Sequence, residues 1–550
     1  MNKQEVSKFL ANYMFILAGF LCIPFMMAFY YQFFVPKELH PQPHSTFAFL
    51  LTILVTLGFA FFLKHHGRLA DGRKFFRKEG FLSLCLIWFL SGVIGGLPFS
   101  FSKTLENPVD AYFEAMSGFT TTGSSVMYPK NIDPVTGKNK PINITLSKRL
   151  NIKYSFYGNI TPVIDPDTGI VLYAGLDAVG KAIIFWRCLM QWLGGMGIVV
   201  LFIAVLPAYG LGGNKLLVQS ELPGPTTESL APRAKDAASL LWKAYLSLTI
   251  IETFLLKIAS SDISILDSLQ ISMATISTGG FIPYREAIQA YNSPVIQWIM
   301  ILFMIIGSTN FTLHFYLIRG KIYRLLDPEF LLYFLTLFIG GTCVVVSLVG
   351  KQELLLSGVS TKLNFVESLR FGMFQYISSQ SSTGFVLVDY DQWPHFAQAV
   401  MITSMYIGGM SCSTAGGIKV LRYYILMRTA VYRTEALFKP EVVRTFKIRK
   451  QPVTQTTKET TLSFFFIVIG FALLSTIIYI ANGLDFRTAF TIAGSMINNN
   501  GVAYGPGGPT QTFAFMSNFS KLISTFWMVL GRLEFFMLLI LLTPKFWKKA

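Results

Sequence analysis

The chain has 550 residues, of which 52% are hydrophobic, 15% aromatic and only 14% charged. Soluble globular proteins carry about 25% charged residues, so the composition excludes a soluble enzyme, a nucleic-acid-binding domain and a disulfide-stapled secreted scaffold. Apolar stretches of about 20 residues recur along the chain, each long enough to cross a hydrocarbon core about 30 Å thick. The sequence therefore predicts an all-α polytopic membrane protein.

The net charge of +17 is concentrated in a few loops. Basic residues cluster at 64–78, at 419–450 and at the carboxyl terminus. Cytoplasmic loops carry such an excess, so we expect both termini on the cytoplasmic side, and no nucleic-acid partner is implied. The predicted spans are residues 9–34, 46–64, 81–101, 179–207, 239–259, 294–318, 330–350, 396–425, 460–482 and 519–543.

Four apolar segments between these spans are too short to cross a membrane and are predicted to be re-entrant half-helices. They are residues 110–119, 267–276, 365–377 and 485–496. Each leads into a polar tetrapeptide that contains glycine. The tetrapeptides are Thr121-Thr122-Gly123-Ser124, Ser277-Thr278-Gly279-Gly280, Ser382-Thr383-Gly384-Phe385 and Asn499-Asn500-Gly501-Val502.

These landmarks indicate an internal repeat. Once an insertion at 127–176 is set aside, the third-position glycines recur about every 110 residues. A second glycine follows each of them in the next span, at Gly195, Gly307, Gly409 and Gly531. The predicted architecture is four parallel helix–pore-helix–helix repeats around a central pore.

The repeats divide the chain into five predicted units. Residues 1–70 form two extra amino-terminal transmembrane helices. The pore repeats follow at residues 71–215 with the external insertion 127–176, at 216–324, at 325–450 and at 451–550.

The four loops suggest a site for a monovalent cation. Non-helical backbone at membrane depth is tolerated where it lines a water-filled cavity or is buried in protein. Glycine permits conformations that turn carbonyl oxygens inward, and a ring of such oxygens replaces the hydration shell of a potassium ion. Ordinary external turns are the alternative. The candidate filter residues are Thr121, Thr122, Gly123, Ser277, Thr278, Gly279, Ser382, Thr383, Gly384, Asn499, Asn500 and Gly501.

Acidic residues near the external ends of these segments have two explanations. They concentrate cations at the pore mouth, or they are solvated loop and helix-cap residues, and the sequence favours the second. They are Asp110, Glu114, Asp262, Asp267, Asp389, Asp391 and Asp485.

Two features of the later spans are unusual. Each glycine in a helix interior costs about 1 kcal/mol relative to alanine, so the small residues of 408–417 are expected to break their helix rather than form a packing face. Arg532, in the last span, costs about 2.5–3.5 kcal/mol at mid-membrane and is expected to face a cavity. The small residues are Gly408, Gly409, Ser411, Ser413, Thr414, Gly416 and Gly417.

Together these motifs resemble a known family. The glycine loops, QWLGGMGIVVL (191–201), ELPGPTTESLAPRAKDAASLLWKAYLSLTI (221–250), NFTLHF (310–315) and GGMSCSTAGGIK (408–419) are similar to the potassium-translocating membrane subunit of the bacterial Trk/Ktr uptake systems. The two extra amino-terminal helices favour the Trk type. The insertion 127–176 and the Asn499-Asn500-Gly501 loop depart from the family pattern.

The resemblance implies potassium uptake across the bacterial inner membrane, with potassium as the transported, filter-bound ion. It also implies that 408–417 is an intramembrane gating loop and that Arg532 is a pore arginine. The implied partners are a second copy of the chain and a cytosolic, nucleotide-binding regulatory ring. The basic segments 64–78 and 419–450 are expected either to dock on this ring or to contact anionic membrane lipid.

Two rival functions are less consistent with the sequence. A secondary transporter of another cation or small solute typically has two repeats, commonly inverted, and ionisable residues at the midplane. A membrane enzyme with its active site in the insertion lacks a metal-spaced histidine cluster. Proton or sodium symport and downhill potassium flow both stay open.

Overall fold

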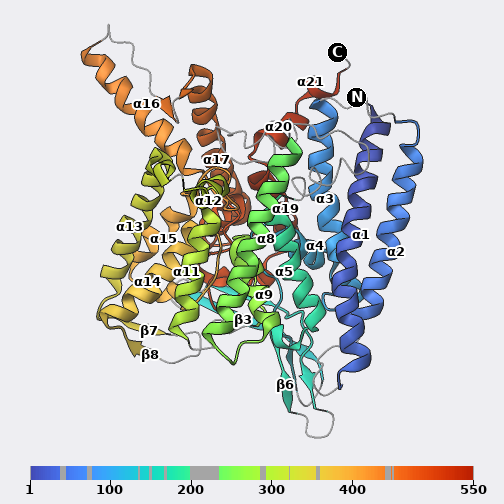
Figure 1. The fold of residues 1–550 in the computed structure, drawn as a ribbon. Coiled ribbons are helices and arrows are strands. Elements are labelled where there is room, and N and C mark those ends of the chain that lie inside the picture. Colours follow the sequence, from blue (N-terminus) through green and yellow to red (C-terminus); the bar gives the residue numbers. More distant parts are fainter. Residues whose placement is uncertain are drawn as a thin grey trace.

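The structure is a computed structural model of an α-helical membrane protein. It describes residues 2–548 except 37–44, 71–76, 134–136, 148–151, 166–169, 198–233, 285–292, 321, 355–359, 440–446 and 449–450. The two termini lie at one end of the helical bundle, and the hairpins that contain β3 and β6 project from the opposite end (Figure 1). We call these the terminal end and the hairpin end.

Two amino-terminal helices stand beside the repeats. They are α1 (Lys3–Phe34) and α2 (Ser45–His66), which pack along each other, while α1 also contacts the first repeat. Both are apolar and partly exposed, as expected for helices that face lipid. This pair matches the two extra helices that the sequence predicts.

Each repeat combines an outer helix, a pore helix and an inner helix. The outer helices are α3 (Arg77–Phe101), α8 (Ala234–Ala259), α13 (Pro328–Leu348) and α17 (Gln455–Ala481). The pore helices are α4 (Pro108–Phe119), α9 (Ile265–Ile276), α14 (Phe365–Gln380) and α18 (Phe486–Ile497). The inner helices are α5 (Lys181–Gly195), α11 (Pro294–Ser308), α15 (His395–Tyr406) and α19 (Asn518–Arg532).

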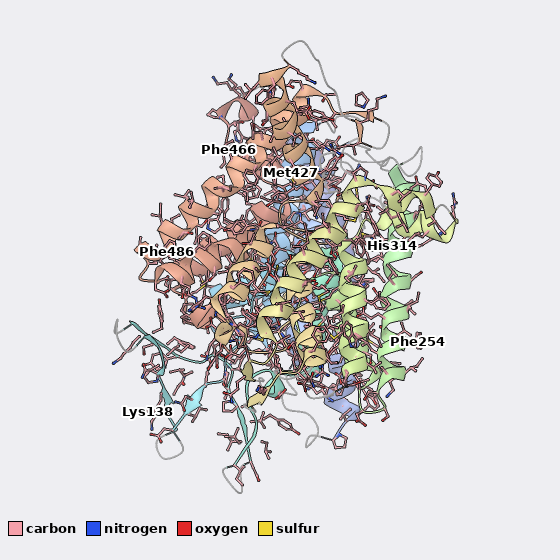
Figure 2. All side chains as sticks on the ribbon, turned by 90° about the vertical axis from the view of Figure 1, so that its left-hand side faces the viewer. Lys138, Phe254, His314, Met427, Phe466 and Phe486 are labelled. Carbon is pink, nitrogen blue, oxygen red and sulfur yellow. The ribbon has the colours of Figure 1, made fainter. Side chains whose placement is uncertain are left out.

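Lipid-facing side chains explain the apolar composition. Phe254 on α8 and Phe466 on α17 project away from the bundle (Figure 2) and are 56% and 67% exposed. Among the described residues, six helices are long and apolar enough to cross a membrane: α1, α2, α3, α8, α13 and α17. The chain is a multi-pass membrane protein.

The inner helices are shorter than the sequence predicts. The expectation of unbroken spans over 294–318 and 519–543 is wrong, because α12 (Phe311–Ile318) is separate from α11 and α20 (Phe536–Leu541) is separate from α19. The expected break at 408–417 is confirmed, since residues 407–419 separate α15 from α16 (Val420–Phe438). The expected span 179–207 continues beyond α5 into residues outside the described ones.

The chain closes with α21 (Pro544–Trp547), and short 3₁₀ helices connect several elements: η2 (Gly175–Ala178), η4 (Ile322–Leu326), η5 (Tyr390–Gln392), η6 (Gly505–Gly507) and η7 (Phe513–Phe515). Short antiparallel hairpins occur only outside the helical bundle in the described part of the chain. The insertion folds into β1 (Asn131–Ile132) with β2 (Asn139–Lys140), β3 (Ile142–Ser147) with β4 (Ile152–Phe156), and β5 (Val163–Ile164) with β6 (Val171–Tyr173). The others are β7 (Gln352–Leu354) with β8 (Ser360–Lys362), and β9 (Lys447–Ile448) with β10 (Gln451–Pro452).

The pore helices form the buried centre, and each begins at a side-chain cap. Asn107, Ser264, Asn364 and Asp485 each accept a hydrogen bond from a backbone N–H in the first turn of the helix that follows. Such caps satisfy amide groups that have no partner within the helix. The carboxyl ends of the pore helices lead into the four loops.

Candidate functional site

All four pore helices end in the same backbone motif. The second residue after each helix has a positive φ angle of 51–55°, at Thr121, Thr278, Ser382 and Asn499. The next residue donates its N–H to the carbonyl oxygen five residues earlier, as in Thr122 to Ser117 at 2.9 Å and Asn500 to Ser495 at 2.9 Å. This is the Schellman ending of a helix, here built without glycine at the left-handed position.

The following glycine in each loop also has a positive φ angle, between 76° and 80°. A Cβ atom on Gly123 would lie 2.2 Å from the carbonyl oxygen of Gly279, and one on Gly280 would lie 1.9 Å from that of Thr383. One on Gly384 would lie 2.4 Å from the oxygen of Asn500, and one on Gly501 would lie 2.2 Å from that of Thr122.

These contacts close a ring. Each repeat's glycine abuts the carbonyl oxygen of the next repeat, and the fourth repeat returns to the first. A side chain at any of the four would collide with backbone, which cannot move aside as a flexible side chain can. Both the φ angle and the close approach therefore require glycine.

The second loop has a different register from the one expected. The sequence pattern pairs Gly279 with Gly123, but the positive φ angle of this loop falls at Gly280. Gly279 instead occupies the carbonyl position that Thr122, Thr383 and Asn500 hold in the other loops. Two consecutive glycines concealed this shift of one residue.

Side chains behind the loops hold the backbone. Thr122 Oγ1 lies 2.8 Å from Thr120 Oγ1, and Thr383 Oγ1 lies 2.7 Å from Ser381 Oγ. Gln191 Nε2 donates to the carbonyl of Gly279 at 2.5 Å, while its Oε1 accepts from Phe281 N at 3.0 Å. Sequence reasoning missed Gln191, whose signal was a polar residue within an apolar span.

A cavity of about 180 Å³ lies above the ring on the hairpin side. Gly123, Gly280, Gly384 and Gly501 all line it, together with residues from the start of the insertion. The four loops thus meet at one space, which the insertion helps to enclose.

The acidic residues near this cavity are largely neutralised or used as caps. Glu114 is fully buried and pairs with Arg187 at 2.7 Å, while Asp110 pairs with Lys521 at 2.7 Å. Asp391 pairs with Arg487 at 2.7 Å, and Asp485 caps α18. Asp485 is a helix cap as expected, whereas Glu114 and Asp110 are buried in ion pairs rather than solvated. Paired carboxylates contribute little net field at the pore mouth.

Residues 407–419 lie directly beneath the ring. Thr414 Oγ1 donates to the carbonyl oxygens of Ile276 at 3.0 Å and Gly307 at 2.9 Å, and Thr278 Oγ1 donates to Thr414 Oγ1 at 3.3 Å. Gly416 N donates to Ser382 Oγ at 2.6 Å. The predicted gate residues are thus brought together with the loops of the second and third repeats.

Arg532 extends these contacts to the first repeat. Its Nη2 donates to the carbonyls of Gly194 at 2.6 Å and Gly195 at 2.7 Å, and its Nη1 donates to Thr414 O at 2.9 Å and Thr121 Oγ1 at 3.3 Å. One guanidinium therefore joins the inner helix of the first repeat, its loop and the segment beneath the ring.

A second cavity, about 50 Å³, lies on the terminal side of the ring. Lys419, Arg532 and Glu534 line it, and Arg422 donates to Glu534 at its edge. The cations exceed the carboxylates here. This cluster combines residues from the loop after α15 and the break after α19, so the sequence alone did not reveal it.

The second set of glycines, predicted at Gly195, Gly307, Gly409 and Gly531, affects helix packing. A Cβ atom on Gly307 would lie 3.1 Å from the carbonyl of Ile276, and one on Gly531 would lie 2.1 Å from that of Ile497. In the first repeat the equivalent contact is made by Gly194, where a Cβ atom would lie 1.8 Å from Phe119 O, rather than by the expected Gly195. These three glycines let the inner helices of the first, second and fourth repeats approach the ends of their own pore helices. The expected third-repeat glycine, Gly409, lies beyond α15 instead, and a Cβ atom on it would lie 2.6 Å from Ser308 O at the end of α11.

Comparisons with known proteins agree with this geometry. A family model described as TrkH, cation transport protein, matches residues 155–549. The chain is 31% identical over 506 residues to the Trk system potassium uptake protein TrkH of Escherichia coli (strain K12), covering 91% of this chain and 92% of that protein. It is 30% identical over 507 residues to the TrkH of Halomonas elongata, with the same coverage of 91% and 92%.

A solved structure shows the same fold. The crystal structure of the potassium transporter TrkH from Vibrio parahaemolyticus matches with a TM-score of 0.77 at 26% sequence identity, covering 100% of both chains. This similarity includes the amino-terminal helices, which lie outside the range of the family model.

Proposed function

The chain belongs to the TrkH family of cation transport proteins, and we propose that it takes up potassium through the ring of four loops. The relatives are named as Trk system potassium uptake proteins. The observation that carries the proposal is the closed cycle in which four glycines abut the carbonyl oxygens of Thr122, Gly279, Thr383 and Asn500.

The chemistry of this ring suits a dehydrated monovalent cation. Carbonyl oxygens replace water around the ion without adding fixed charge, so the ion is bound but released quickly. The carboxyl ends of the four pore helices point toward the ring, and their partial negative charge favours a cation over an anion. We therefore assign the candidate filter residues to potassium coordination or to its immediate support, and include Gly280 among them.

The proposed gate is the segment 407–419 with Arg532. The contacts of Thr414 and Gly416 to the underside of the loops support a closed arrangement. The guanidinium of Arg532 repels a potassium ion and donates to carbonyls that the broken helices leave free. Met410 and Ile418 are buried in apolar clusters, whereas the seven glycine, serine and threonine residues of 408–417 add little apolar surface, which suits a two-state element.

Opening is proposed to be controlled from the terminal end, which we place in the cytoplasm of a bacterium whose inner membrane holds the protein. The end of α16 and the chain termini project there (Figure 1), and α16 carries exposed basic residues such as Arg428. We propose a cytosolic nucleotide-binding ring and a second copy of this chain as partners, with anionic lipid also in contact with the basic surface.

No coupled ion is needed for accumulation. A membrane potential of 100 mV contributes about 2.3 kcal/mol per monovalent cation, which corresponds to roughly 45-fold accumulation. Downhill flow through a selective, gated pore therefore explains uptake, and a symported ion would add to it.

Flux measurements test the proposal. The full chain in liposomes should pass potassium faster than sodium when each is the only permeant cation and no other solute is added. Protein-free liposomes provide the control. A folded protein that carries neither ion until an organic solute is supplied would overturn the proposal in favour of a secondary transporter.

A further inference from the structure

The left-handed residue that follows each pore helix is never glycine. Glycine is usual at this position of a Schellman ending, because a side chain there is strained. The four positions hold Thr121, Thr278, Ser382 and Asn499, with φ angles of 55°, 52°, 55° and 51°. Threonine is β-branched, and a positive φ angle is an outlier for that class of residue. Each repeat therefore retains a side chain that its own backbone disfavours.

These four side chains are polar and buried. Their exposed fractions lie between 0% and 3%. The described residues that line the cavity on the hairpin side include the four ring glycines but none of these four residues. Strained backbone persists where the surrounding structure requires it, and it gathers at functional sites. The contacts of the side chains indicate what that requirement is.

In the second and third repeats, this side chain contacts the segment 407–419. Ser382 Oγ accepts a hydrogen bond from Gly416 N at 2.6 Å. Thr278 Oγ1 lies 3.3 Å from Thr414 Oγ1, which itself donates to backbone oxygens of the second repeat. Glycine at either position would give the same backbone conformation without the contact. The side chains are therefore explained by the segment beneath them.

The first repeat contacts the other part of the proposed gate. Thr121 Oγ1 accepts a hydrogen bond from Arg532 Nη1 at 3.3 Å. The fourth repeat differs, because Asn499 Nδ2 donates to Met528 O on α19 and to Thr122 Oγ1, both at 2.9 Å. Three loops thus hold the gate, while the fourth loop is bonded to the inner helix of its own repeat and to the first loop.

The carbonyl oxygens of the ring have supports of their own. In the third repeat, Thr383 N and Gly384 N donate to Ser378 O at 3.0 and 3.1 Å. Ser378 Oγ also donates to Phe385 O at 2.8 Å. These bonds join the loop to its own pore helix and do not involve the gate. Removing the Ser382 hydroxyl leaves them in place, so the loop keeps its conformation.

We propose that Thr121, Thr278 and Ser382 dock the gate on the underside of the ring and are not potassium ligands. They are positioning residues, whose oxygen atoms contact the gate in its closed arrangement. The carbonyl oxygen of the next residue in each loop binds the ion. This assignment rests on the ion path proposed above, and it places gating and ion binding on adjacent residues.

Ser382→Gly in the full chain tests the proposal. Glycine keeps the left-handed conformation, relieves its strain and removes the acceptor of Gly416 N. With no cytosolic partner added, potassium flux into liposomes should rise about threefold or more, the change expected from losing one hydrogen bond of the closed state. The ratio of potassium to sodium flux should stay within about twofold of the wild type, because the carbonyl ligands remain.

Two further variants separate docking from backbone effects. Ser382→Thr keeps the hydroxyl at a position where the first two repeats already have threonine, so its flux should match the wild type. Lys103→Gly is the matched control, because Lys103 is exposed and has a φ angle of 57°. Glycine there relieves the same strain without removing a gate contact, and flux should again match the wild type.

Potassium flux that is unchanged or lower in a folded Ser382→Gly variant would overturn the proposal. An equal rise in Lys103→Gly would also overturn it, and a larger loss of selectivity would make the hydroxyl an ion ligand instead. If Ser382→Gly fails to fold, Thr121→Gly takes its place with the same expectations. A wild-type chain that carries no potassium would overturn the ion path itself, whereas a conducting wild type with an unchanged variant overturns the docking alone.

Discussion

The loop glycines combine two demands in one residue. A left-handed φ angle costs about 1–2 kcal/mol for a residue with a side chain, and four non-glycine residues of the same loops tolerate it, among them Thr121 and Asn499. The left-handed conformation alone would therefore not require glycine two residues further along the loop, at Gly123, Gly280, Gly384 and Gly501. The carbonyl oxygen of the neighbouring repeat makes the requirement strict, because a Cβ atom would lie 2.4 Å or less from it.

Gly384→Ser should lower potassium over sodium selectivity by at least about tenfold, equivalent to 1.4 kcal/mol. The added Cβ displaces the carbonyl of Asn500 and widens or distorts one side of the ring. Separate potassium and sodium fluxes in liposomes measure the ratio.

Gly483→Ser supplies the matched control. Gly483 has a φ angle of 90°, but a Cβ atom there would have no neighbouring atom within 4 Å, so the substitution brings the backbone strain without the collision. An unchanged selectivity ratio in Gly384→Ser, or an equal loss in Gly483→Ser, would remove the ring from the account of selectivity.

The inner helices differ from ordinary transmembrane helices because they stop near the middle of the bundle. All four inner helices end near the carboxyl ends of the pore helices, at Gly195, Ser308, Tyr406 and Arg532. Ending a helix leaves up to four carbonyl groups without intrahelical partners. Arg532 and Thr414 satisfy several of these groups, and thereby connect helix ends that a continuous helix would keep apart.

Arg532→Ala should raise potassium flux several-fold when no cytosolic partner is added. The substitution removes both the charge below the ring and the donors that hold Thr414 O. Arg532→Lys should raise it less, because the charge remains while the fork of donors is lost. Flux into liposomes is the measurement, and Arg428→Ala, at an exposed position on α16, is the control.

Deleting Ser413 to Gly416 should act in the same direction. The deletion removes the contacts to Ile276, Gly307 and Ser382. Combined with Arg532→Ala, it should raise flux by less than the product of the two separate effects, because both act on one barrier. Wild-type flux in a folded deletion variant would leave 407–419 as a packing segment only.

At the scale of the whole molecule, the insertion joins the first repeat to the fourth. Tyr154 on β4 donates its hydroxyl to Asp485 Oδ1 at 2.9 Å and accepts from Asp485 N at 2.9 Å. Asp485 also caps the pore helix α18. Burial raises the pKa of Tyr154 to about 12, so the hydroxyl retains its proton at neutral pH. The β3–β4 hairpin is thus hydrogen-bonded to the cap of α18, the pore helix that leads into the fourth loop of the ring.

Tyr154→Phe should destabilise the protein by about 1–3 kcal/mol, since the Asp485 amide and carboxylate lose a partner. Thermal unfolding in detergent should show a lower Tm. Tyr157→Phe changes the same residue type in the same insertion, but Tyr157 is 61% exposed and the Tm of this variant should match the wild type. Identical Tm values for both variants would show that this contact does not hold the insertion.

Local features of the sequence were sufficient to predict the architecture. The length of an apolar run decides whether a helix can cross a membrane, so the pore helices were predicted close to their observed bounds, and 110–119 corresponds to Pro108–Phe119. Glycine density within 408–417 predicted the break that separates α15 from α16. The membrane class, the four repeats and the family are consequences of such local patterns, and the structure and the comparisons confirm them.

The contacts between residues of different repeats were decided by the tertiary structure alone. The assignment of Gly280 rather than Gly279 depends on a carbonyl contact with Thr383, which belongs to the next repeat. Gln191 behind the second loop and the Arg422–Glu534 pair likewise join residues from different repeats. Periodicity and composition report on neighbours within a helix or a turn, whereas ring closure, charge pairing and cavities depend on which repeats lie side by side. That arrangement is set by packing, so only the folded chain reveals it.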